Sequence, residues 1–152
     1  MLSIKKILAP VDLSEASPKL VPSILTMATK FDAEIHLLFV VRLSSHLTGF
    51  YIPYPKISEF EQAVLEGAEK KLIEFQEEYF KAWPRTRAKV VQGDISDEIF
   101  DYIDTADIDL LIMGTHGRKG LDRIVFGSVA ERVIKASAIP VLVVNPYGNI
   151  DA

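Results

Sequence analysis

The chain has 152 residues, of which 49% are apolar and 25% are charged, a size and composition that predict one globular domain over residues 1–152. Its formal net charge of -4 argues against general binding to nucleic acids or anionic membranes, because both require a basic surface. Cysteine is absent, which excludes disulfides and thiol chemistry, and no apolar run approaches the roughly 20 residues of a membrane span, so we expect a cytoplasmic protein.

Five short apolar runs alternate with longer amphipathic segments along the chain. The runs cover residues 4–11, 34–41, 87–93, 109–114 and 140–144. Near-continuous apolar strands of this kind are typical of a parallel sheet that is covered on both faces.

The segments between these runs predict helices. The first is expected to begin with Ser17 as its N-cap, and the second follows an apolar periodicity over 60–79 that Pro84 ends. Asp94 is predicted to cap the third helix, and Ser128 to begin the fourth. The alternation predicts right-handed crossovers and an α/β three-layer sandwich, with a five-stranded parallel sheet and four helices.

Residues 42–57 lack a clear periodicity and contain many turn formers. Connections of this length are uncommon inside compact domains and serve as lids, binding loops or disordered segments. We expect a variable surface loop here, and a role over a binding pocket remains the alternative.

A basic, glycine-rich segment follows the fourth apolar run. Two residues separate Gly114 from Gly117, nine separate Gly117 from Gly127, and Ser128 follows at once. Glycines let the backbone approach a ligand closely, and a helix that begins at Gly127-Ser128 would offer bare amide hydrogens to an anion such as phosphate. Ligands of open α/β sheets bind beyond the carboxyl ends of the strands, where Asp12 also lies, so a phosphate site is predicted there.

Other phosphate-binding patterns do not fit the chain. There is no G-x-x-x-x-G-K-[ST] of a P-loop, and no G-x-G-x-x-G follows the first strand, so a dinucleotide fold is poorly supported. A phosphorylated receiver domain would share the architecture but would need clustered acids at the strand ends. The first strand offers Asp12 alone.

The spacing Gly114-x2-Gly117-x9-Gly127-Ser128 resembles the nucleotide-binding signature of the ATP-binding subgroup of the universal stress protein family. The stretches "ILAPVDLSEAS" and "IPVLVVNP" resemble its opening and closing strands, and the similarity leaves only residues 42–57 without a counterpart. The resemblance implies an adenine nucleotide alpha-hydrolase-like fold with strand order 3-2-1-4-5. It also implies a cytoplasmic ATP-binding protein that acts as a stress-response sensor or regulatory switch, with an unknown regulatory protein partner.

The resemblance further implies ligand contacts at matched positions. Along the adenosine it places Pro10, Val11, Asp12 and Val40; beneath the ribose and phosphates Met113 and Gly114; in the phosphate turn His116 and Gly117; and at the helix start Gly127, Ser128 and Val129. It also implies Mg2+ or Mn2+ with Asp12 as a metal ligand, because a hard cation relieves the repulsion between a carboxylate and a triphosphate. Ala130 stands where many ATP-binding relatives have Ser or Thr, so one hydroxyl contact is missing.

Several of these residues have a structural alternative. Asp12 is equally suited to capping the turn that follows it, and the glycines could mark a structural turn. His116 fits a loop donor to phosphate better than a general base, and no catalytic residue is identified. The cations between residues 118 and 123 are either phosphate clamps or a solvated surface, and His36 is expected to be structural or solvated.

The last apolar run has consequences for assembly and function. The strand order that the resemblance implies puts it on an edge, and an exposed apolar edge strand aggregates unless it is covered. We therefore expect a homodimer in which Val141 to Val144 pairs with the same strand of a second copy, as the resemblance also implies. Two other functions remain open, a slow ATPase and a nucleotide-free dimeric interaction module.

Overall fold

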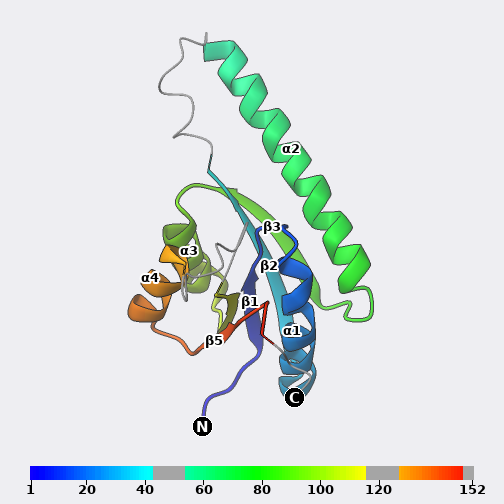
Figure 1. Cartoon of the computed structure of the whole chain (residues 1–152), viewed down its shortest axis with the longest axis vertical. Coiled ribbons are helices and arrows are strands. Elements are labelled where there is room, and N and C mark those ends of the chain that lie inside the picture. The colour runs from blue at the N-terminus through cyan, green and yellow to red at the C-terminus, as the bar shows by residue number, and fades with distance from the viewer. Residues whose placement is uncertain (43–53, 116–126, 149–152) are drawn as a thin grey trace.

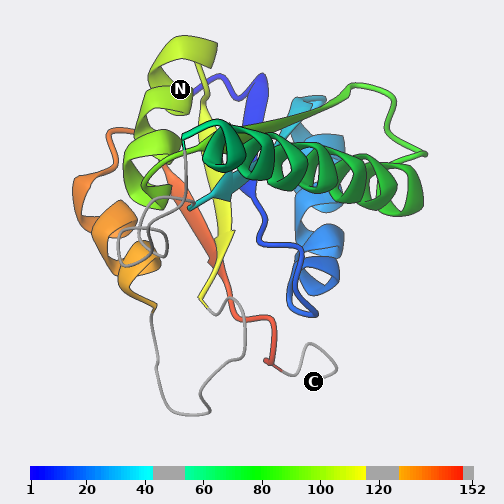
Figure 2. The same ribbon diagram turned by 90° about the horizontal axis from the view of Figure 1, so that it is seen from above.

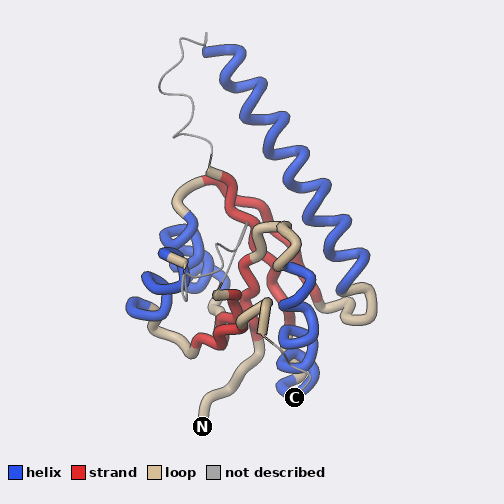
Figure 3. The backbone as a smooth tube through the Cα atoms, in the orientation of Figure 1, coloured by secondary structure: helices blue, strands red, loops and turns tan. Residues whose placement is uncertain are grey.

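The computed structural model describes residues 1–42, 54–115 and 127–148. The elements in chain order are β1 (Lys6–Pro10), α1 (Ser17–Phe31), β2 (Glu34–Val41), α2 (Tyr54–Tyr79), β3 (Thr86–Gln92), α3 (Ile95–Ala106), β4 (Leu110–Gly114), α4 (Ser128–Ala136) and β5 (Val141–Val144). The strands, red in Figure 3, form one sheet. Their order is β3-β2-β1-β4-β5, and all four pairings are parallel. The predicted fold class and strand order are confirmed.

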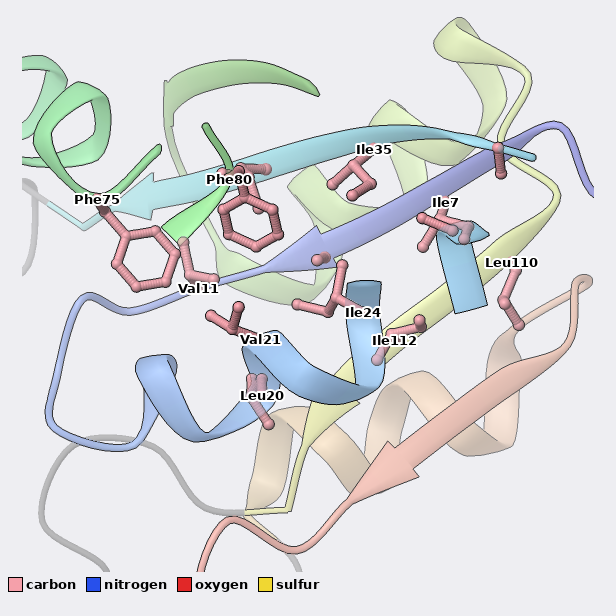
Figure 4. Close-up of a cluster of buried hydrophobic side chains, with 14 of the residues drawn as sticks. Ile7, Val11, Leu20, Val21, Ile24, Ile35, Phe75, Phe80, Leu110 and Ile112 are labelled. Carbon is pink, nitrogen blue, oxygen red and sulfur yellow. The ribbon is translucent and has the colours of Figure 1, made fainter. Parts of the chain in front are cut away.

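The sheet is the middle of three layers. Helices α1 and α2 cover one face, and α3 and α4 cover the other (Figures 1 and 2). On the first face, Ile7 of β1, Ile24 of α1 and Ile112 of β4 point toward one another in the largest cluster of buried side chains (Figure 4). Every strand therefore has apolar surface to bury on both sides, which explains its near-continuous apolar run.

Two of the predicted helix starts are confirmed and one is wrong. Asp94 caps α3, since its Oδ1 accepts a hydrogen bond from the Asp97 amide at 3.1 Å, and α4 begins at Ser128. Helix α1 has Ala16 as its N-cap with no side-chain cap, so Ser17 is its first helical residue instead. The reason is that the Ser17 hydroxyl bonds to the preceding turn.

Helix α2 is longer than its periodicity predicted. It begins at Tyr54, so the expectation of an irregular loop over 42–57 is wrong for residues 54–57, while residues 43–53 lie outside the described residues. Phe60, the first residue of the apolar periodicity over 60–79, is 53% exposed, because the first turns of α2 extend beyond the sheet (Figure 1). None of the helices in the described part of the chain is long and apolar enough to cross a membrane.

Candidate functional site

A cleft of about 770 Å³ opens at the carboxyl ends of β1, β2 and β4. The order of the strands reverses between β1 and β4, and α/β sheets bind ligands at such a switch point. The predicted site residues that line the cleft are Pro10, Val11, Asp12, Val40, Met113, Gly114, Gly127, Ser128 and Val129. His116 and Gly117 lie outside the described residues.

Asp12 organises the turn between β1 and α1. Its Oδ1 accepts hydrogen bonds from the Ser14 amide at 2.9 Å, the Ser14 hydroxyl at 2.6 Å and the Ser17 hydroxyl at 2.9 Å. Ser17 Oγ in turn accepts from the amide of Leu13, whose φ of 59° is left-handed. The capping role weighed for Asp12 is therefore present in the structure, and contact with a ligand or metal stays a prediction.

The start of α4 is open toward the cleft. Gly127 has φ -64° and ψ 156°, and its amide donates to the carbonyl oxygen of Thr115 at 3.1 Å. No side chain of the described residues caps the helix, and Ser128 is exposed. Because the first amides of a helix have no partner within it, the first turn of α4 can donate to an anion.

Gly114 and Ala130 also lie at the carboxyl edge of the sheet, in different surroundings. Gly114 is the last residue of β4 and pairs in register with Val144. Ala130 lines the cleft but is 2% exposed and packs with Ile99 and Met113. A hydroxyl at position 130 would therefore lie in largely apolar surroundings.

Helix α2 contributes cleft residues that the sequence did not indicate. Gly67 and Lys71 line the cleft from α2, and Arg42 lines it from the end of β2. Periodicity identifies the buried stripe of α2, but it gives no sign of which exposed residues border a cleft. Among the described residues, the charged groups that line the cleft are Asp12, Arg42 and Lys71.

The start of α3 is closed by charged side chains of the chain itself. Arg132 of α4 lies 3.2 Å from Asp94 Oδ1 through Nη1 and 2.7 Å from Asp97 Oδ1 through Nη2. All three side chains are substantially exposed, so these ion pairs add little stability in water. They do join the N-terminal turn of α3 to α4 and fill the anion-attracting end of α3 with carboxylates.

His36 is a buried polar residue in the amino-terminal half of β2, away from the cleft. Its Nδ1 is 2.7 Å from the Tyr102 hydroxyl of α3, and its Nε2 is 2.6 Å from Glu34 Oε1, although the latter contact is poorly aligned for a hydrogen bond. Burial lowers the pKa of His36, against the opposing effect of Glu34, and burial raises the pKa of Tyr102. The expectation that His36 is structural or solvated is settled in favour of a structural role, since the residue is 4% exposed.

Metal binding has little support from side chains alone. Within residues 1–42, 54–115 and 127–148, no group of three or more His, Cys, Asp or Glu side chains is arranged to hold a metal ion. Mg2+ is commonly held by one or two carboxylates together with phosphate oxygens. A single carboxylate such as that of Asp12 therefore fits a cation that arrives with a phosphate ligand.

Comparisons with known proteins agree on one family. The model of the universal stress protein family matches residues 3–145. The chain is 35% identical over 144 residues to universal stress protein MJ0531 of Methanocaldococcus jannaschii, covering 92% of this chain and 81% of that protein. It is 32% identical over 152 residues to MJ0577 of the same organism, covering 92% and 94%.

Solved structures show the same fold. The structure of MJ0577 superposes with a TM-score of 0.84 at 29% identity, covering 97% of this chain and 100% of that one. A universal stress protein in complex with cAMP has a TM-score of 0.69 at 20% identity, covering 95% and 99%. One from Archaeoglobus fulgidus in complex with dAMP has a TM-score of 0.60 at 17% identity, covering 94% and 98%.

Proposed function

The chain belongs to the universal stress protein family, and we propose that its cleft binds an adenine nucleotide, foremost ATP, as the input of a stress-response sensor or regulatory switch. The observation that carries the proposal is the uncapped start of α4, which opens on a cleft at the switch point of the sheet. The helix dipole and the first amides favour a phosphate there. We expect the protein to act in the cytoplasm and to signal to a regulatory protein partner.

The walls of the cleft suit the parts of such a nucleotide. Val40, Ile95 and Met113 give an apolar wall that matches the faces of an adenine ring, and the turn at Asp12 lies across from α4. A cleft of about 770 Å³ is within the range of small-molecule sites, roughly 300 to 1,000 Å³. The cAMP and dAMP complexes of other family members support the same ligand class.

Asp12 is the side chain that we propose as a ligand of Mg2+ or Mn2+ in the nucleotide complex. Its Oδ1 is engaged in the β1–α1 turn, whereas Oδ2 accepts no hydrogen bond from the described residues. The cation would neutralise charge between this carboxylate and the phosphates. Asp12→Asn should keep the turn, since an amide oxygen also accepts hydrogen bonds, and should abolish the metal dependence of ATP binding.

Calorimetric titration tests the proposed ligand directly. Protein stripped of nucleotide is titrated with ATP, ADP and AMP, with and without Mg2+, and heat of binding is expected with at least one of them. Mass spectrometry of small molecules extracted from the purified protein is an independent measurement. The absence of heat with all three nucleotides would overturn the proposal and favour an interaction module with an idle pocket.

We also propose a homodimer through β5. Val141–Val144 pairs with β4 on one side and forms an edge of the described sheet, with all four residues half-buried. The carbonyls of Pro140 and Val144 accept hydrogen bonds from the amides of Leu111 and Thr115. Backbone groups of successive residues in a strand point to alternate sides, so the amide of Val143 points away from β4. An unpaired apolar edge of this kind favours pairing with a second copy.

Val143→Pro tests the dimer, because it removes an outward amide without removing a hydrogen bond to β4. Light scattering should show a dimer for the unaltered chain at micromolar concentration and a monomer for this variant. Val143→Thr keeps the amide and should remain dimeric. A stable monomer of the unaltered chain would contradict the proposal.

A further inference from the structure

The single cleft is lined by side chains from both faces of the sheet, and we call the part on each face an arm. Side chains alternate along β2, so Leu38 and Val40 pack with the α3 and α4 cluster, whereas Phe39 and Val41 pack on the α1 and α2 side. The nucleotide contacts proposed above lie along β1, at Val40, at the end of β4 and at the start of α4. They include neither Phe39 nor any residue of α2, which line the second arm, between α1 and α2.

Apolar side chains line the second arm and remain partly exposed. Leu13 from the β1–α1 turn, Phe39 from β2 and Val64 from α2 all line the cleft at intermediate exposure. Phe39 packs against both clusters on this face, so it forms the floor between the two helices. An apolar ligand would remove this surface from water, which is favourable in proportion to the area covered.

Helix α2 leaves space beside this floor. Gly67 lies in the middle of α2, where glycine is a poor helix former, and it lines the cleft. A Cβ at Gly67 would meet nothing within 4 Å, so no close packing requires a glycine there. The missing side chain therefore widens the arm rather than relieving a crowded contact.

The rim of the arm is positively charged. Lys71 follows Gly67 by one helical turn, and Arg42 lies at the end of β2; both line the cleft and both are exposed. Neither forms an ion pair with another described residue. The third charged residue of the cleft, Asp12, uses its Oδ1 inside its own turn.

From these observations we infer that the arm between α1 and α2 binds an amphiphilic organic anion of the medium-chain carboxylate class. Its apolar chain lies over Phe39 beside Gly67, and its carboxylate is directed to Lys71 and Arg42 at the rim. The inference does not depend on nucleotide binding.

Titration of the nucleotide-stripped full chain with decanoate tests the inference by calorimetry. Gly67→Leu fills the arm and should weaken decanoate binding by at least about tenfold, and Lys71→Gln should weaken it by about three- to tenfold at low salt. Two matched controls lie on α2 but do not line the cleft, Ala63→Leu for bulk and Lys70→Gln for charge, and both should stay within about twofold. The ATP affinity of Ala63→Leu and Lys70→Gln, which do not line the cleft, should equal that of the unaltered chain.

Several results would overturn the inference. These are no binding of decanoate to the unaltered chain, equal binding by Gly67→Leu and Ala63→Leu, and displacement of decanoate by saturating ATP, which would put both ligands in one arm. Leucine is a better helix former than glycine, so Gly67→Leu should fold, and its far-ultraviolet circular dichroism checks this. A chain that binds decanoate but no nucleotide would leave this inference standing and remove the proposed function.

Discussion

Two glycines precede the two helices on one face of the sheet, and the backbone requires only the first of them. Gly93, before α3, has φ +153°, and a Cβ there would lie 2.5 Å from Glu98 Oε1. Gly127, before α4, has φ -64°, and a Cβ there would meet, among the described residues, only the Thr115 carbonyl oxygen at an ordinary 3.7 Å. The described part of the fold therefore explains Gly93 and gives no structural reason for Gly127.

The helix starts that follow these glycines differ in the same way. Helix α3 has the Asp94 carboxylate on its N-terminal amides and two more acids, Asp97 and Glu98, in its first turn. Helix α4 has no side-chain cap from the described residues. These residues thus supply an anion to the start of α3 and none to the start of α4, and four substitutions or conditions test this contrast.

Gly127→Asp gives α4 the kind of cap that α3 already has and should have the largest effect. The new carboxylate would occupy the first amides and repel phosphate, so ATP affinity should fall by about 100-fold, or about 2.7 kcal/mol. Calorimetric titration with ATP measures the loss. Gly127→Ala, which adds no acceptor, should stay within about threefold of the unaltered chain.

Equal ATP affinity in Gly127→Asp and the unaltered chain would mean that phosphate does not bind at α4. Thermal unfolding of the same variant separates this outcome from misfolding, because a new cap should leave stability equal or higher.

Gly93→Ala tests the other half of the contrast. An alanine at φ +153° is strained, so the free energy of unfolding should fall by about 1 to 3 kcal/mol. Gly127→Ala should change it by no more than about 0.5 kcal/mol, because its backbone angles suit any residue. Urea unfolding of both variants gives the comparison, and equal losses would remove the distinction between the two glycines.

Asp94→Ala removes the cap of α3 and should cost about 1 kcal/mol of stability without altering ATP affinity. The loss follows from the unsatisfied amide of Asp97, with a small addition from the exposed Arg132 contact. Asp94→Asn keeps a capping oxygen and should lose less. A drop in ATP affinity would show that the nucleotide also depends on α3.

The contact between His36 of β2 and Tyr102 of α3 predicts a smaller, pH-dependent effect on stability. The pKa of His36, which contacts Tyr102 of α3, is lowered from 6.5 mainly by burial, with Glu34 opposing and Arg87 and Lys6 reinforcing the shift. The unfolded chain then binds a proton more readily than the folded chain. This contribution to stability is full above about pH 6.5 and is lost as the pH falls from there toward the lower pKa of the folded state.

His36→Gln measures this contribution. The melting temperature of the unaltered chain should decrease more steeply between pH 7.5 and pH 5.5 than that of the variant. Parallel curves would show that His36 does not change its protonation on unfolding in this range.

Much of the fold follows from local patterns in the sequence. The five apolar runs became the five strands, and Asp94 and Ser128 mark helix starts as expected, because strand burial and helix capping depend on neighbours in the chain. The strand order came from the family resemblance rather than from periodicity. The error over the start of α2 at Tyr54 and the exposure of Phe60 both arose where the helix extends beyond the sheet, since an apolar stripe does not say where its partner surface ends.

The candidate site, too, was predictable from the sequence only where its features are local. The spacing of Gly114, Gly127 and Ser128 pointed to a phosphate site from the sequence alone, because a bare helix start is a local property. Only the tertiary structure showed that no described neighbour requires glycine at position 127, and that α2 brings Gly67 and Lys71 to the second arm of the cleft. Those facts depend on which helix lies over which face of the sheet, and packing between segments distant in sequence decides this.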